Sequence, residues 1–182
     1  MSDKRKSAIF LDRDGTIIQD KGYLHQKDDV EYLEGVINAL RCLCEMGFLL
    51  FIITNQSGIA RGYYTEQEFM DLNLWMCEDL KRQGVIITKT YYCPHLEEGI
   101  IPKYAKMCGC RKPKTELFWK AAEEYRIDMS KSFAIGDRMR DLMICREAKV
   151  RGLLLTQNAM PQEGINICRN WDEILQTIIR LH

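Results

Sequence analysis

Residues 8–16 of the chain are Ala8-Ile9-Phe10-Leu11-Asp12-Arg13-Asp14-Gly15-Thr16. Four apolar residues are followed at once by two carboxylates that flank an arginine, and then by a glycine. A short continuous apolar run bounded by turn residues predicts a strand that is buried on both faces. Ligands of parallel α/β sheets bind beyond the carboxyl ends of the strands, so the acidic pair after this strand is the first place to look for a site.

The remaining sequence repeats the alternation of apolar runs with stretches of helical spacing. Further strands are predicted over residues 48–53, 86–92, 133–135 and 153–155. Helices are predicted over 36–46, 65–82, 115–125 and 138–149, with a closing helix around residues 171–178. Thr65 and Glu68 form a capping-box pattern at the start of the second helix.

The alternation of predicted strands and helices predicts an α/β fold, with a Rossmann-like doubly wound parallel sheet and helices on both faces. Because no linker interrupts the pattern, we expect a single domain over residues 1–182.

Composition narrows the classes of partner. The 26 basic residues equal the 26 acidic ones, which gives no overall attraction to nucleic acid or to a membrane surface. No apolar run approaches the length of a membrane span or an export signal, so we expect a cytoplasmic protein with reduced cysteines. Long heptad patterns are absent from the sequence, and a monomer is the default expectation. A small molecule is therefore the expected partner.

Polar residues follow each of the first four predicted strands. Asp12 and Asp14 follow the first, Thr54 follows the second, a cysteine-rich loop ending at Lys112 follows the third, and Asp137 follows the fourth. Each residue alone has an ordinary interpretation, since an acidic pair beside glycine often forms a turn. Their order along one edge of the sheet is what indicates a site.

This order resembles the four motifs of the haloacid dehalogenase superfamily. The matching segments are Asp12-x-Asp14-Gly15-Thr16, Thr54, Lys112 and Gly136-Asp137-x-x-x-Asp141. The resemblance implies a magnesium-dependent phosphatase. It also implies that the backbone carbonyl of Asp14 joins Asp12 and Asp137 in holding Mg²⁺.

Elementary chemistry agrees with that implication. A phosphate ester is anionic and repels nucleophiles, and a divalent cation held by the carboxylates of Asp12 and Asp137 would reduce that repulsion. Ionised Asp12 is the expected nucleophile and would form an aspartyl-phosphate. Asp14 is the expected acid and base, while Lys112 and the Thr54 hydroxyl would hold the transferring group. Glycoside hydrolysis also uses two carboxylates, but it does not require the lysine or the third acidic site.

The loop after the third strand carries a second metal pattern. Cys93-Pro94-His95 is followed by Cys108-Gly109-Cys110, which offers three sulfurs and one imidazole for a tetrahedral zinc ion. Four protein ligands leave no position for water, so we expect a structural zinc that orders the loop and places Arg111 and Lys112. Reduced thiols in a mobile loop are the alternative.

The same loop narrows the resemblance to the small histidinol-phosphatase-related branch of the superfamily. The similar segments are residues 20–25, 55–62, 91–95 and 108–113. The resemblance implies substrate contacts from Asp20, Lys21, Gly22, Tyr23, Asn55, Gln56, Ser57, Arg111 and Arg138, beside the catalytic set. It favours a small phosphorylated sugar, a heptose bisphosphate, as substrate and a role in lipopolysaccharide precursor synthesis.

The distance between Asp12 and the first predicted helix leaves no room for a large cap domain. An open site suits a substrate that is recognised by a second anionic group. Arg111 and Arg138 are candidates to bind that group, because a guanidinium matches phosphate with two hydrogen bonds. A histidinol-phosphate phosphatase, a zinc hydrolase and an inactive zinc-stabilised binding module stay open as alternatives.

Overall fold

The computed structural model describes residues 5–158 and 163–182, and within them the chain forms one six-stranded parallel sheet. Its strands are β1 (Ala8–Leu11), β2 (Leu49–Asn55), β3 (Ile87–Cys93), β4 (Phe133–Gly136), β5 (Arg151–Leu155) and β6 (Ile165–Cys168). Their spatial order is β3-β2-β1-β4-β5-β6, the doubly wound arrangement that the sequence predicts.

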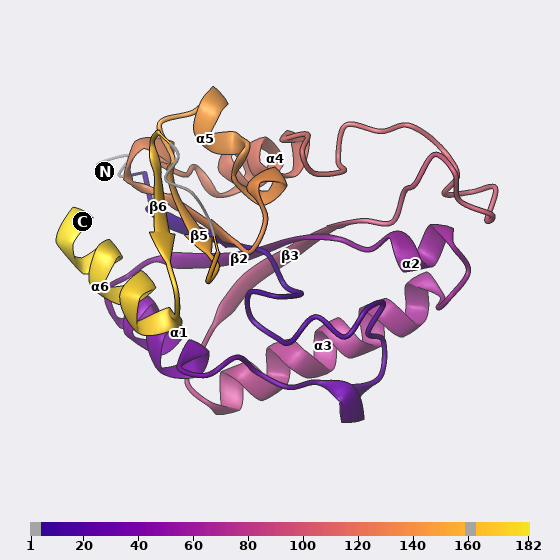
Figure 1. Ribbon diagram of the computed structural model, residues 1–182, viewed down its shortest axis with the longest axis horizontal. Helices are drawn as coiled ribbons and strands as arrows, with labels where there is room; N and C mark the ends of the chain where they lie inside the picture. The colour runs from indigo at the N-terminus through magenta and orange to yellow at the C-terminus, as the bar shows by residue number, and fades with distance from the viewer. Residues whose placement is uncertain (1–4, 159–162) are drawn as a thin grey trace.

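Helices cover both faces of the sheet. Alternate residues of β1 divide between two apolar clusters: Ile9 and Leu11 belong to one, and Ala8 and Phe10 to the other. Helices α1 (Val36–Glu45), α3 (Glu66–Arg82) and α6 (Trp171–Leu181) pack on the first face, and α4 (Glu116–Tyr125) packs on the second. Figure 1 shows these two helical layers on opposite sides of the strands. None of the described helices is long and apolar enough to cross a membrane.

The local patterns explain where these helices begin. The Thr65 hydroxyl accepts a hydrogen bond from the Glu68 amide at 3.1 Å, and the Glu68 carboxylate accepts one from the Thr65 amide at 2.7 Å. The predicted capping box is therefore confirmed at the start of α3. Asn170 caps α6 in the same way, by accepting from the Glu173 amide at 2.9 Å.

Two predictions about secondary structure were wrong. No strand was predicted at β6, a short strand that lies at the edge of the sheet against β5 and has only Cys168 buried. Residues 138–149 do not form one helix; they form a 3-10 turn, η3 (Met139–Leu142), and a four-residue helix, α5 (Ile144–Glu147). The Asp141 carboxylate accepts from the Arg138 amide at 3.1 Å, which caps this short turn, and it pairs with Lys112 at 2.8 Å. A 3-10 turn is common at the N-terminus of a helix, and here only four residues continue in the α conformation.

The strand order decides where a site can form. β1 pairs in parallel with β2 on one side and with β4 on the other. The connection out of β1 leads toward β2, whereas β4 continues toward β5 and β6, so the two halves of the sheet diverge between β1 and β4. A crevice opens at such a switch point, outside the carboxyl ends of the two strands.

Candidate active site

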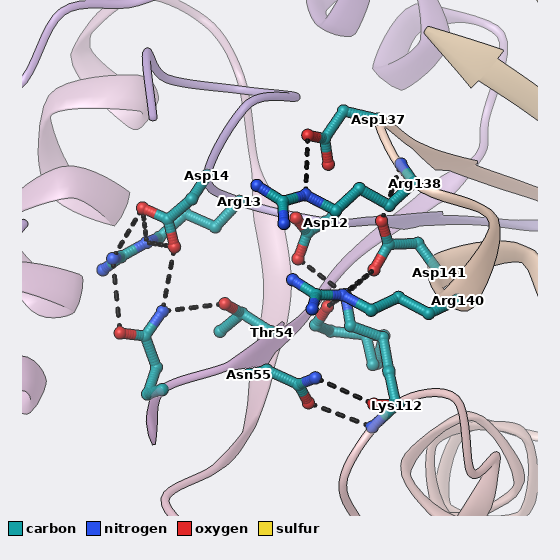
Figure 2. A network of polar contacts seen from close by, with 12 residues as sticks. Asp12, Arg13, Asp14, Thr54, Asn55, Lys112, Asp137, Arg138, Arg140 and Asp141 are labelled. Carbon is teal, nitrogen blue, oxygen red and sulfur yellow. Dashed lines mark hydrogen bonds and ion pairs between the residues drawn. The ribbon is translucent and has the colours of Figure 1, made fainter. Parts of the chain in front are cut away.

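Three carboxylates meet at the switch point. Asp12 follows β1 and is fixed by its amide, which donates to the Ile135 carbonyl of β4 at 2.9 Å. Asp137 follows β4, and Asp141 lies on η3. Carboxylate oxygens of the three residues all lie within 4.8 Å of one another. Figure 2 shows the three side chains gathered at the site.

Gly15 makes the close approach of Asp137 possible. Its φ angle is 80°, in the left-handed region, and a Cβ at this position would lie 2.6 Å from an oxygen of Asp137. Any other residue would therefore bring both backbone strain and a steric clash. The glycine after the acidic pair is thus part of the carboxylate site and not only a turn residue.

Lys112 provides the positive charge in this cluster. Its ammonium lies 2.6 Å from Asp12 Oδ1, 2.8 Å from Asp141 Oδ1 and 2.6 Å from the Ile53 carbonyl oxygen, with only 1% of the side chain exposed. Burial alone lowers the pKa of Lys112, but the two carboxylates outweigh it and the net shift is upward. Lys112 is therefore held as a cation against Asp12, and the three acceptors fix its position.

Asn55 braces the backbone at Lys112. The side-chain amide of Asn55 donates to the Lys112 carbonyl at 3.0 Å and accepts from the Lys112 amide at 3.0 Å. This pair of bonds imitates a strand ladder and ties the end of β2 to the end of the cysteine-rich loop. Asn55, predicted to bind substrate, thus has both ends of its amide engaged with protein.

The carboxylates outnumber the cations around Asp12. Burial raises the pKa of Asp12, and the neighbouring Asp141 and Asp14 carboxylates add to this rise, which Lys112 opposes. Burial also raises the pKa of Asp137, with Asp141 adding to the effect and Arg138 opposing it. A set of oxygen ligands with excess negative charge fits a hard divalent cation such as Mg²⁺.

The structure brings together the two side chains that were predicted to hold the metal and adds a third carboxylate to them. Asp12 and Asp137 lie together as expected, but the third carboxylate of the cluster is Asp141, to which the sequence analysis gave no metal role. The spacing Asp137-x-x-x-Asp141 was the available indication. The side chain of Asp14, whose backbone carbonyl is the predicted ligand, turns toward Arg13 and away from the cluster (Figure 2).

Asp14 is held by a network of its own. The Arg13 guanidinium contacts Asp14 Oδ1 at 2.8 Å, and the Gln56 amide nitrogen donates to Asp14 Oδ2 at 3.1 Å. The same nitrogen donates to the Thr54 hydroxyl at 2.8 Å. Asp14 and Thr54, predicted as acid/base and phosphoryl-binding groups, are therefore joined through Gln56.

A cleft of about 360 Å³ opens over Asp12 and Asp14. It is rich in arginine, with Arg61, Arg111, Arg138 and Arg140 all among its lining residues. Arg138 spans the opening, because its guanidinium lies 3.1 Å from Asp20 and 3.4 Å from Asp137. The cleft therefore offers a nucleophilic carboxylate at one end and several guanidinium groups for an anion.

All but one of the predicted substrate residues line this cleft. Those that line it are Asp20, Gly22, Tyr23, Asn55, Gln56, Ser57, Arg111 and Arg138. Lys21 is paired instead with Glu31 at 2.7 Å, on the surface, and Thr54 is buried beside the lining residues. Arg61, from the family-like segment 55–62, also lines the cleft, as do Tyr64 and Arg140, for which no site role was predicted.

The four predicted zinc ligands also come together. The sulfur of Cys93 lies 3.5 Å from that of Cys108 and 2.9 Å from that of Cys110, and His95 Nδ1 lies 3.2 Å from the Cys110 sulfur. The four ligand atoms all lie within 4.8 Å of one another. Three thiols and one imidazole are the donor set that suits tetrahedral zinc.

The cysteine-rich loop has additional anchors. Leu96 and Tyr104 of the loop pack in a small apolar cluster with Ile59 and Phe69. Glu66 at the start of α3 accepts hydrogen bonds from the hydroxyl of Tyr104 at 2.6 Å and that of Tyr92 at 2.9 Å. The loop is thus attached to the body of the protein by contacts that do not involve the cysteines.

Arg111 connects the loop to the cleft. It follows Cys110 directly, and its guanidinium donates to the His95 carbonyl at 3.3 Å. The next residue is Lys112, whose ammonium contacts Asp12. A fixed conformation of the cysteine cluster therefore helps to fix the positions of two cationic side chains at the site.

The fold and this constellation define a class of enzyme. A family profile described as "Polynucleotide kinase 3 phosphatase" matches residues 7–147. A solved structure described as a HAD-like phosphatase from Mesorhizobium loti superposes with a TM-score of 0.87 at 29% identity, covering 97% of this chain and 85% of that one. The chain belongs to the haloacid dehalogenase superfamily of phosphatases.

Two further relatives specify the family within that class. The D-glycero-beta-D-manno-heptose-1,7-bisphosphate 7-phosphatase of Haemophilus ducreyi is 46% identical over 162 residues, which are 87% of this chain and 88% of the relative. The structure of a D,D-heptose 1,7-bisphosphate phosphatase from B. bronchiseptica, complexed with magnesium and phosphate, has a TM-score of 0.83 at 26% identity and covers 97% of this chain and 99% of that one. This chain belongs to the family of these phosphatases.

Proposed function

We propose that this enzyme removes the C7 phosphate of D-glycero-β-D-manno-heptose 1,7-bisphosphate, in the synthesis of nucleotide-heptose and lipopolysaccharide precursors. The observation that carries the proposal is the buried contact of Asp12 with Lys112 at 2.6 Å, at the floor of an arginine-rich cleft. The relatives named above supply the identity of the sugar and its anomer.

The reaction follows from the side chains at the switch point. An oxygen of Asp12 attacks phosphorus, the bond from phosphorus to the C7 oxygen breaks, and Asp14 gives its proton to the departing alkoxide. Asp14 then takes a proton from water, which attacks the aspartyl-phosphate and releases inorganic phosphate and free Asp12. Lys112 and the Thr54 hydroxyl stabilise the charge on the transferring group.

We propose Mg²⁺ as the catalytic cofactor, because the ligands around Asp12 are all oxygen. Asp12, Asp137 and the backbone carbonyl of Asp14 would hold the ion, with Asp141 close enough to orient it. When bound, Mg²⁺ supplies neutralising charge for the phosphoryl oxygens.

The charge of the cleft favours a bisphosphate over an amine-bearing substrate. Arg61, Arg111 and Arg138 suit a second phosphate, because a guanidinium binds phosphate with paired hydrogen bonds. Histidinol phosphate carries an ammonium group, which needs a free carboxylate at the rim. Asp20 is the acidic residue placed for that task, and it is already paired with Arg138 at 3.1 Å.

Comparative kinetics test the proposed substrate. We expect kcat/KM for the heptose β-1,7-bisphosphate to exceed that for histidinol phosphate, a sugar monophosphate and a 3′-phosphorylated oligonucleotide by about 100-fold or more, because only the bisphosphate uses the arginines while presenting a primary phosphate to Asp12. Turnover should require Mg²⁺. Phosphate release in steady state measures both, and an equal or higher kcat/KM for histidinol phosphate would reject the proposed substrate.

We also propose that Cys93, His95, Cys108 and Cys110 hold a structural zinc ion. All four ligands come from protein, so no position is left for a reacting water. The ion would sit at the junction between the cysteine-rich loop and Arg111. Its binding energy, on the order of 10 kcal/mol in small zinc sites, would stabilise the loop where the apolar anchors do not reach.

Zinc removal tests this second site. We expect one zinc per chain by elemental analysis, and we expect Cys110→Ser to lose that zinc, to lower the melting temperature and to reduce kcat/KM by about 10-fold, because Arg111 and Lys112 lose their fixed positions. Cys77→Ser, a substitution on α3 outside the cluster, is the matched control and should keep its zinc.

A chelation experiment separates a structural zinc from a catalytic one. After the protein is stripped of metal and supplied with Mg²⁺ alone, a partial loss of kcat together with a lower melting temperature is expected. Complete loss of turnover without a change in melting temperature would instead indicate that zinc takes part in the chemistry.

A further inference from the structure

Gln56 is a buried amide whose hydrogen-bonding capacity is fully used within the protein. Only 2% of the residue is exposed. Its oxygen accepts from the Tyr64 hydroxyl at 2.6 Å and from the Arg13 guanidinium at 3.3 Å. Its nitrogen donates to Thr54 at 2.8 Å and to Asp14 at 3.1 Å. A side-chain amide has two acceptor positions and two N–H groups, so none is left for a substrate.

The surrounding groups determine which way the amide faces. A guanidinium can only donate, so the atom of Gln56 that faces Arg13 has to be the oxygen, and the NH₂ group has to face Thr54 and Asp14. Arg13 is itself fixed, because it is 1% exposed, donates to the Leu24 carbonyl at 3.3 Å and lies over the Phe69 ring at 5.6 Å. The orientation of the amide is thus imposed by a buried cation that cannot turn away.

The fixed amide has a consequence for each of its two acceptors. The Thr54 hydroxyl accepts from Gln56, which leaves its single proton to be donated to another oxygen. Asp14 is held at Oδ2 by Gln56 and at Oδ1 by Arg13, so its carboxylate keeps one position at the edge of the cleft. In a catalytic site, groups that already hold their reactive positions do not have to reorient on the way to the transition state, and the activation barrier is lower for that reason.

We propose that Gln56 is a positioning residue that directs the Thr54 proton toward the transferring phosphoryl group and holds Asp14 for proton transfer. This inference rests on the proposed phosphatase function, and it replaces the expectation that Gln56 contacts the substrate. Tyr64 and Arg13, on the oxygen side of the amide, hold Gln56 in this orientation.

Two variants of Gln56 test the inference, each assayed with the heptose bisphosphate and with p-nitrophenyl phosphate. Gln56→Met keeps the length of the side chain but removes both donors, so we expect kcat to fall about 100-fold while KM stays within about 3-fold of wild type. Gln56→Glu keeps the shape but presents an oxygen to Thr54 and Asp14 above the pKa of the new carboxyl, and its kcat at pH 7.5 should fall at least as far.

The pH profile distinguishes positioning from a general structural defect. Below its pKa the new carboxyl of Gln56→Glu regains one donor, so its kcat relative to wild type should recover about 10-fold or more between pH 7.5 and pH 5.5. Gln56→Met has no titrating group and should show no recovery. Gln67→Met, the same substitution on the exposed face of α3, is the control and should match wild type.

Each result either supports or overturns the proposed positioning role of Gln56. Variants of Gln56 with kcat within about 3-fold of wild type, or a raised KM with unchanged kcat, would overturn the inference, the latter by showing that Gln56 binds substrate. A wild-type enzyme that turns over p-nitrophenyl phosphate but not the heptose bisphosphate would remove the proposed substrate and leave the role of Gln56 tested by the generic ester. Thermal unfolding of each variant confirms that folded protein was assayed.

Discussion

Asp12→Asn should abolish phosphatase turnover, with kcat falling about 10⁴-fold or more, because an amide oxygen cannot form the aspartyl-phosphate. The loss should be the same for the heptose bisphosphate and for p-nitrophenyl phosphate, since both have to pass through the same covalent step. Steady-state phosphate release measures the effect. Rapid acid quenching of wild type during turnover should place the phosphoryl group on the peptide that contains residue 12.

The variant should remain folded, which makes the measurement decisive. Asparagine has the shape of aspartate, and Lys112 keeps its contacts with Asp141 and the Ile53 carbonyl. Removing one of three clustered carboxylates also relieves repulsion, so the melting temperature should stay close to that of wild type. Asp29→Asn, on the exposed turn η1 (Lys27–Asp29), is the matched control and should be fully active. A phosphorylated peptide from elsewhere in the chain would refute the assignment of the nucleophile.

Lys112→Met should have the second largest effect, and it should act on both activity and stability. We expect kcat to fall about 10³-fold, because the charge of the transferring group loses its buried cation. We also expect the free energy of unfolding to fall by about 3 kcal/mol, since the Asp12 and Asp141 carboxylates are left buried without their partner. Urea unfolding in the absence of divalent cations measures the change in the free energy of unfolding.

The stability loss in Lys112→Met should depend on pH in a defined direction. Without the ammonium, the pKa of Asp12, which burial already raises, rises further above that of the unfolded chain. An acid whose pKa is raised on folding stabilises the native state while both states are protonated and loses that contribution as pH rises toward the native pKa. The deficit should therefore be smallest near pH 5 and should grow toward pH 8. Lys81→Met, on the exposed end of α3, is the control, and a pH-independent deficit would contradict this account.

The parts of the fold that the sequence predicts are those with strong local patterns. β1 and β4 are short apolar runs followed directly by acidic residues, and α3 begins with a capping box. The parallel order of the strands then brings Asp12 and Asp137 together, because both come directly after neighbouring strands. Here local propensity and topology point to the same arrangement, and the prediction succeeds.

The failures have physical reasons. β6 is four residues long and lies at the sheet edge, where its residues are mostly half-exposed and its pattern is weak. Residues 138–149 have helical composition, but they begin as a 3-10 turn that carries Asp141 to Lys112, and only Ile144–Glu147 is α-helical. A contact between positions far apart in the sequence leaves no trace in a local pattern.

The site residues also divide into those that local sequence patterns predict and those whose role depends on long-range contacts. The catalytic set could be named from the segments that follow the strands, whereas the network around Gln56 depends on Arg13 and Tyr64 arriving from separate segments. Composition and spacing assign Gln56 to the cleft but do not reveal that its amide is already occupied. Only the assembled structure distinguishes a residue that contacts substrate from one that holds such residues in place.

The strand order β3-β2-β1-β4-β5-β6 also affects when activity appears during synthesis. The nucleophile is made first, but β4 lies beside β1 and follows it by more than a hundred residues, so the catalytic pocket stays open-sided until most of the polypeptide has left the ribosome. Pairing of such distant segments is a slow, late event in folding. A nascent or truncated chain that ends before residue 133 therefore carries Asp12 and Lys112 without Asp137 and Asp141, and phosphatase activity arises only as the protein nears completion.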